Sequence, residues 1–240
     1  VRQEYNISIA GATDKLNYYM SAGYLDDSGI ISGSGFNRYT GLAKVDYQAK
    51  KWLRVGANMS FSNSDNKAPS AQTSDDWGNS GNLFYVVNSI APIYPLYVRN
   101  ADGSIMINQA TGKPVYDAST TTNFHRAGAT GNAVRDIDYN IYEDNRDLFT
   151  GKWYAQLTPL EGLVITANIA ANLQNDRANR LYSTFGSSSA VDGGTYVYSE
   201  RMFSVNNQYM ADYSHTFAKK HNFEVLAGYE QYKMKDQFLD

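Results

Sequence analysis

The sequence predicts an all-β fold, an antiparallel transmembrane β-barrel of which about eight strands lie in this chain. Residues 52–62 alternate strictly between apolar and polar side chains, so a strand here has one apolar and one polar face. The segment is close to the ~9–11 residues that a tilted strand needs to cross a bilayer. The same pattern returns in seven further segments, separated alternately by short turns and long loops. Bacterial outer-membrane barrels have this asymmetry.

The composition restricts the function classes. The chain has 240 residues, 20 of them Tyr, with no Cys and a formal net charge of −3. The charge argues against a nucleic-acid or anionic-membrane partner, which would require a basic patch, and the lack of Cys excludes a disulfide framework or a thiolate metal site. No run approaches the ~18 apolar residues of a membrane helix, but a barrel strand turns only every second residue toward lipid. The chain begins at Val1 without an export signal, so we expect an interior piece of a longer chain.

Eight strands are expected, grouped as four hairpins within one barrel domain. The hairpins are predicted at residues 4–26, 36–62, 147–173 and 201–232. Their turns, rich in Gly, Asp, Lys, Pro and Glu, are predicted at 11–15, 48–51, 159–162 and 218–221. The connections between hairpins are longer, and the largest is a loop at 63–146. By analogy with known barrels, we expect the short turns in the periplasm and the long loops outside the cell.

The alternation also predicts which side chains face lipid. These apolar residues are Leu53, Val55, Ala57, Met59, Phe61, Leu163, Ile165, Ala167 and Ile169. The opposite row is polar and is expected to line a hydrated lumen, although a barrel wall is polar inside whether or not solute passes. It includes Arg54, Asn58, Lys152, Gln156, Asn168 and Gln208.

The loop at 63–146 is long enough to have structure and function of its own. Helical spacing is expected at residues 83–90, before Pro92, and a hairpin is expected around the turn at residues 100–103. Loop aromatics are candidates for contact with a solute or a partner, and loop packing is the favoured explanation for any single one. They are Trp77, Tyr85, Tyr94, Tyr97, Tyr182 and Tyr196.

No catalytic constellation is present in the sequence, and we expect neither an enzyme nor a cofactor. The three His residues are dispersed, and Gly186-Ser187-Ser188-Ser189 lacks the second glycine of a nucleophile elbow. Asp136, Asp138 and Asn140 place oxygen ligands at alternate positions, as at the start of a calcium loop. The glycine and terminal Glu of that loop are missing, so a solvated loop is favoured over calcium in the extracellular loops.

Three separated segments resemble the SusC/RagA-type TonB-dependent outer-membrane transporters, in the order found in that family. They are residues 5–62, from YNISIAG to NMSFS, residues 145–173, NRDLFTGKWYAQLTPLEGLVITANIAANL, and residues 221–233, HNFEVLAGYEQYK. The resemblance implies a bacterial outer-membrane location, as in Bacteroidetes, and a barrel of about 22 strands with a plugged lumen. The plug domain is absent from this sequence.

The same resemblance implies TonB-dependent import of oligosaccharides or peptides. It implies a SusD-like surface lipoprotein that acts as a lid. It also implies contact with TonB through N-terminal parts that this sequence lacks. Transporter–lid pairs would assemble as dimers. Some of the loop aromatics would then contact the substrate or the lid.

Two alternatives stay open at the level of sequence. Eight strands can close into a small outer-membrane barrel that acts as an anchor or adhesin. A soluble all-β carbohydrate-binding domain would also alternate, with the apolar rows buried between two sheets.

Overall fold

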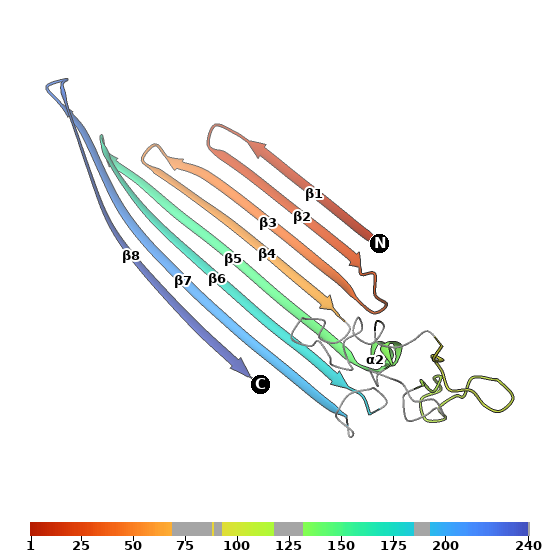
Figure 1. Cartoon of the computed structure of the whole chain (residues 1–240). Helices are drawn as coiled ribbons and strands as arrows, with labels where there is room; N and C mark the ends of the chain where they lie inside the picture. The colour runs from red at the N-terminus through yellow and green to blue at the C-terminus, as the bar shows by residue number, and fades with distance from the viewer. Residues whose placement is uncertain (69–87, 89–92, 118–131, 185–192, 240) are drawn as a thin grey trace.

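The computed structural model of the chain describes residues 1–68, 88, 93–117, 132–184 and 193–239. Its eight strands form one antiparallel sheet in sequence order, from β1 to β8 (Figure 1). The strands are β1 Arg2–Ala12, β2 Leu16–Ser28, β3 Gly35–Lys50, β4 Leu53–Lys67, β5 Ile141–Leu160, β6 Leu163–Tyr182, β7 Gly194–Phe217 and β8 His221–Leu239. A short helix, α2 (Ala133–Tyr139), precedes β5. Among the described residues, no helix is sufficiently long and apolar to span a bilayer.

The four predicted hairpin turns are confirmed and lie together at one end of the sheet, called here the turn end (Figure 1). Gly162 has φ 82°, and Ala218 and Lys219 have φ 51° and 55°, the left-handed values that tight hairpin turns require. The long connections lie at the opposite end, called the loop end. The structure therefore has the predicted alternation of short and long connections.

The strands are longer than predicted at the loop end. β4 continues to Lys67 and β5 begins at Ile141, so the connection between them spans 68–140 and not 63–146. β6 and β7 likewise extend to Tyr182 and from Gly194. The extensions of β4 and β6 are mostly polar on both faces, so they lack the apolar row that marks a strand in the sequence.

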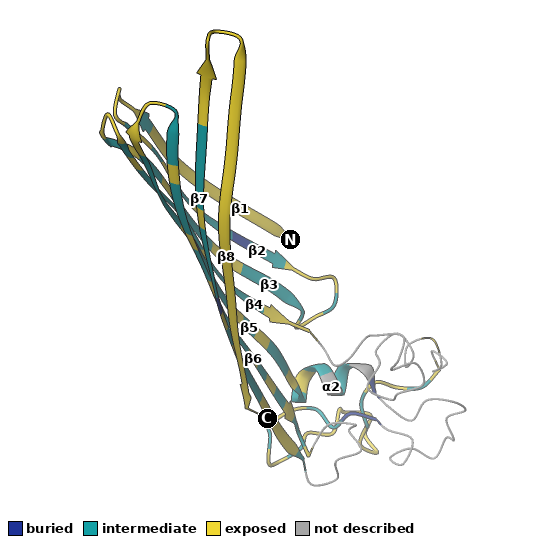
Figure 2. Ribbon diagram, turned by 90° about the vertical axis from the view of Figure 1, so that its left-hand side faces the viewer, coloured by how far each residue is buried: buried dark blue, intermediate teal, exposed yellow. Residues whose placement is uncertain are grey.

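The sheet has no packed core among the described residues. The buried hydrophobic side chains are Leu25 and Tyr116 alone, and most strand residues are half-buried or exposed (Figure 2). No second sheet covers either face within the described part of the chain. The sheet is also open: β1 and β8 are its edges and do not pair with each other.

The register aligns the apolar rows into one face, and the band of apolar residues on it runs diagonally. Register partners followed from strand to strand connect Leu16 on β2 to Tyr229 on β8. Leu16 lies at the turn end of the apolar band on its strand, whereas Tyr229 lies at the loop end of the band on its strand. The centre of the band moves by about seven residues between β2 and β8. With about 3.4 Å per residue and about 4.8 Å between strands, this corresponds to a strand tilt of about 40°.

Strands of transmembrane barrels tilt by about 35–45° to the barrel axis, so an apolar band that is level in the membrane crosses their ladders at this slope. The hairpin of β7 and β8 accordingly reaches furthest at the turn end (Figure 2). The diagonal band is not visible in any single strand, because it depends on the register between strands.

Candidate functional site: the polar face of the sheet

The predicted polar residues lie together on the face opposite the apolar band. Arg54 pairs with Gln156, Asn58 pairs with Lys152, and Asn168 pairs with Gln208. Asn168 Nδ2 also donates to Gln208 Oε1 at 3.2 Å. The period of two places these residues on one surface, as the alternation predicts.

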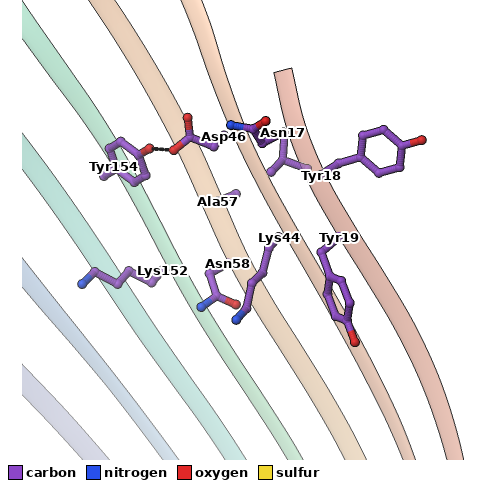
Figure 3. Close-up of a pocket in the computed structure, with 10 residues that line it drawn as sticks. Asn17, Tyr18, Tyr19, Lys44, Asp46, Ala57, Asn58, Lys152 and Tyr154 are labelled. Carbon is purple, nitrogen blue, oxygen red and sulfur yellow. Dashed lines mark hydrogen bonds between the residues drawn. The ribbon is translucent and has the colours of Figure 1, made fainter. Parts of the chain in front are cut away.

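A polar cluster near the turn end joins three strands. Arg54 donates to both carboxylate oxygens of Asp46, from Nε at 2.8 Å and from Nη2 at 2.9 Å. The Tyr154 hydroxyl donates to the same carboxylate across the intervening strand β4 (Figure 3). Gly56 makes this crossing feasible: a Cβ there would lie 2.2 Å from Tyr154 Cε1, so the ring lies where a side chain would be.

A shallow hollow of about 450 Å³ lies beside this cluster. Lys44 and Lys152 line it and are exposed, and Asn58 lies between them on β4, paired with both in register (Figure 3). The side chains present amino and amide groups, which suit carboxylates, carbonyls or hydroxyls of a polar solute.

A second hollow, of about 620 Å³, lies near the loop end and is lined by charged groups. Arg146 Nε donates to Asp176 Oδ1 at 2.6 Å, and Arg180 pairs with Asp144. The Tyr198 hydroxyl donates to Glu200 Oε2 at 3.1 Å. Sequence reasoning missed these residues, because it placed most of them in loops.

The charges on the polar face are segregated. Basic side chains are concentrated on β3–β5, where they outnumber the acidic ones: Arg38, Lys44, Arg54, Arg146 and Lys152 against Asp46 and Asp144. On β7 and β8 the described charged residues of this face are all acidic: Glu200, Asp212, Glu224, Glu230 and Asp236. A solute that touches both sides would meet opposite potentials.

The described part of the large loop forms a small folded unit at the loop end. Its predicted hairpin is confirmed: Arg99 bridges Ile105, and Asn100 N–H donates to Ser104 O at 2.8 Å. The Ser104 hydroxyl and N–H donate to Asp102 in the turn, which lowers the pKa of that carboxyl. The turn chemistry of Asn, Asp and Gly explains why the sequence revealed this element.

The unit is held to helix α2 by Tyr116 and Asn132. Tyr116 is only 5 % exposed, and its hydroxyl donates to the Asp138 carboxylate. Burial, followed by this bond, raises the pKa of Tyr116 above the ordinary tyrosine value. Asn132, 3 % exposed, donates to the carbonyls of Leu96 and Asp117 and accepts from the first turn of α2 as its N-cap.

The structure distributes the candidate tyrosines over three environments. Tyr97 packs against Tyr116, with ring centroids 5.1 Å apart, as ordinary loop packing would have it. Tyr182 and Tyr196 were predicted in a loop, which is wrong: they lie at the end of β6 and in β7, whose pairing continues that far. Tyr94 lies in the described loop, and Trp77 and Tyr85, like the predicted helix at 83–90, lie outside the described residues.

The segment with the spacing of a calcium loop is helical. Residues 136–139 belong to α2, and Asp138 accepts the Tyr116 hydrogen bond. The solvated loop predicted there is wrong, because Asn132 caps a helix that the sequence pattern did not reveal. Among the described residues, no group of three or more His, Cys, Asp or Glu side chains could hold a metal ion.

Known proteins resemble the chain over nearly its whole length. TonB-dependent receptor P39 of Formosa agariphila is 25% identical over 234 residues, which cover 95% of this chain. TonB-dependent receptor P3 of the same organism is 24% identical over 96% of it. The chain is thus similar to TonB-dependent receptors. The predicted resemblance is thereby confirmed, although no family model matches the chain.

The fold agrees with solved structures of one such system. A chain of the RagAB peptide transporter superposes on 99% of this chain with a TM-score of 0.72 and 21% identity. The RagAB peptide importer in its open-open state gives the same TM-score at 20% identity. This chain spans about a fifth of the length of the TonB-dependent receptors and about a quarter of the RagAB chain.

Proposed function

We propose that this chain is part of the wall of an outer-membrane barrel that imports solutes in a TonB-dependent manner. The diagonal apolar band carries the proposal, because a level belt of lipid around tilted strands requires that slope. The opposite face is polar and carries two hollows, as the wall of a hydrated lumen needs. The names of the relatives, TonB-dependent receptors, point to the same activity.

The open edges of the sheet favour a larger barrel over the two alternatives. Unpaired backbone groups on β1 and β8 cannot remain exposed in lipid, so these strands require further strands as partners. A closed barrel of these eight strands would pair β1 with β8, and a soluble sandwich would cover the apolar face with a second sheet. Neither arrangement occurs among the described strands.

The proposed orientation and partners follow from the two ends of the sheet. Short turns suit the periplasm, and the folded loop unit suits the outer surface, where a SusD-like lipoprotein could cover it. The solved relative is a RagAB complex, which supports a partner of this kind. TonB would act through a plug and N-terminal parts beyond this sequence. Two transporter–lid pairs would associate as a dimer.

Of the two predicted cargo classes, the segregated charges favour peptides over neutral oligosaccharides. A peptide carries groups of both signs and can meet the basic side chains of β3–β5 and the acidic ones of β7–β8 together. The RagAB system is named a peptide transporter.

Uptake by cells tests the proposal. Cells that express the full-length protein carrying this chain are given labelled peptides or labelled neutral oligosaccharides. Peptide uptake should disappear when the gene is disrupted and when a protonophore removes the energy that TonB transmits. Uptake of both cargo classes that survives gene disruption would contradict the proposed import.

A further inference from the structure

Four basic side chains lie on the apolar face of the sheet, just beyond the loop-end edge of the apolar band. They are Arg177, Arg201, Lys233 and Lys235, here called the basic patch. The register places Arg201 beside Gln237, Lys235 beside Phe203 and Lys233 beside Val205. Arg177 stands opposite Ser199, two pairs further toward the loop end than Arg201. All four are exposed.

Their height relative to the apolar band follows from the strand tilt. On β6 and β7 the band ends at Leu173 and Phe203, and on β8 it ends at Tyr229. The first basic residue follows within four residues of these ends on every one of the three strands, as read from the sequence. Arg201 lies two residues beyond the end of the band, Arg177 and Lys233 lie four beyond it, and Lys235 lies six beyond it. The four charges therefore lie in the zone where hydrocarbon gives way to lipid headgroups.

The corresponding edge on β4 and β5 is built differently. There the carboxylates have partners: Asn63 donates to Asp147 Oδ1 at 2.7 Å, and Asn145 donates to Asp65 Oδ1 at 2.6 Å. Lys67 pairs with Glu143 at 3.0 Å. The basic patch makes no ion pair with any described residue, and the apolar face of β6–β8 has no acidic side chain nearby to neutralise it.

We propose that the basic patch binds the phosphate groups of an outer-leaflet lipid. Arg and Lys at a membrane surface attract anionic headgroups, and the guanidinium groups can hold phosphate through paired hydrogen bonds. The exposed rings of Phe203, beside Lys235, and Tyr229, four residues before Lys233, form the adjacent edge of the apolar band, where they can pack against the upper acyl chains of the same lipid. The inference rests on the membrane location in the proposed function.

Native mass spectrometry of the full-length protein, titrated in detergent with lipid A, tests this site. We compare lipid A that carries its phosphates with lipid A from which they have been removed. The wild-type protein should retain the phosphorylated lipid more strongly. Substitution of all four residues by Gln should weaken that retention by at least about tenfold, because it removes the positive charges that attract the phosphates. Binding of the dephosphorylated lipid should not change.

Two further variants control the result. K44Q/K152Q removes two positive charges from the polar face and should retain phosphorylated lipid A as the wild type does. R177K/R201K/K233R/K235R keeps the charge and should bind within a few-fold of the wild type. Each variant is first shown to fold by its shifted migration in an unheated gel.

Equal retention of phosphorylated lipid A by the wild type and the four-Gln variant would overturn the lipid site. An acidic partner protein or a second copy would then be the occupant to seek. Ala57 lies on β4, far from the basic patch. Labelling of Ala57→Cys by lipid-soluble reagents therefore tests the membrane location separately from the lipid site. If Ala57→Cys is open to water, both proposals fail.

Discussion

At the scale of single residues, Gly56 determines how the polar face is joined. Its missing side chain lets the Tyr154 ring cross β4 and reach Asp46, two strands away. The alternation in the sequence predicts that Gly56 and Arg54 share a face. It does not predict the crossing, because the partner residue lies about a hundred positions further along the chain.

Gly56→Val should therefore destabilise the barrel. The new side chain displaces Tyr154, so the charge-assisted hydrogen bond to Asp46 is lost, at a cost of about 1–3 kcal/mol. Gly41→Val is the matched control, since a Cβ at Gly41 has no atom within 4 Å. The two variants are compared by the denaturant midpoint of unfolding in lipid. Equal midpoints would show that the crossing contributes nothing.

Asn132 has a comparable role in the loop. Asn132→Ala removes both the cap of α2 and two hydrogen bonds from a buried amide. We expect the loop unit to lose about 1–3 kcal/mol of local stability while the sheet is unaffected. Hydrogen exchange of the α2 amides should accelerate accordingly, whereas exchange in β4 and β5 should not. Asn100→Ala, at an exposed turn, is the control, and an equal effect there would contradict the assigned role.

At the scale of elements, the hairpins could be predicted from the sequence and the strand ends could not. From Ile165 to Ile169 apolar and polar residues alternate, so β6 is evident from its apolar row. Beyond Leu173 the same strand carries Asn175, Arg177 and Asn179 on that face, which read as loop. The continuing ladder to β5 and β7 keeps this segment extended. Pairing with neighbours, not local pattern, sets these boundaries.

The two faces of β4 and β6 should respond differently to a charge. Ala57→Arg or Ile165→Arg places a cation at the middle of the apolar band and should cost about 2–4 kcal/mol. Asn58→Arg and Thr166→Arg are the neighbouring controls on the polar face and should cost less than about 1 kcal/mol. Unfolding free energies in lipid bilayers give the comparison. Similar costs on both faces would mean that the assignment of faces is wrong.

At the scale of the whole molecule, the slope of the apolar band relates the sequence to the membrane. The alternation identifies which residues share a face, and the register between strands adds the tilt. The charge segregation on the polar face also emerges only when all strands are aligned. The polar residues of the predicted hairpins are thus predictable from the sequence. Those of the second hollow lie in the strand extensions and are not, and the layout of both hollows needs the paired sheet.

Cysteine scanning through residues 53–61 of the full-length protein in its own outer membrane tests the central claim most directly. Each single Cys is exposed in turn to a water-soluble and a lipid-soluble maleimide. We predict a strict alternation: Leu53, Val55, Ala57, Met59 and Phe61 positions react with the lipid-soluble reagent, and the positions between them react only with the water-soluble one. Protection of the apolar set from both reagents would show that protein, and not lipid, covers this face.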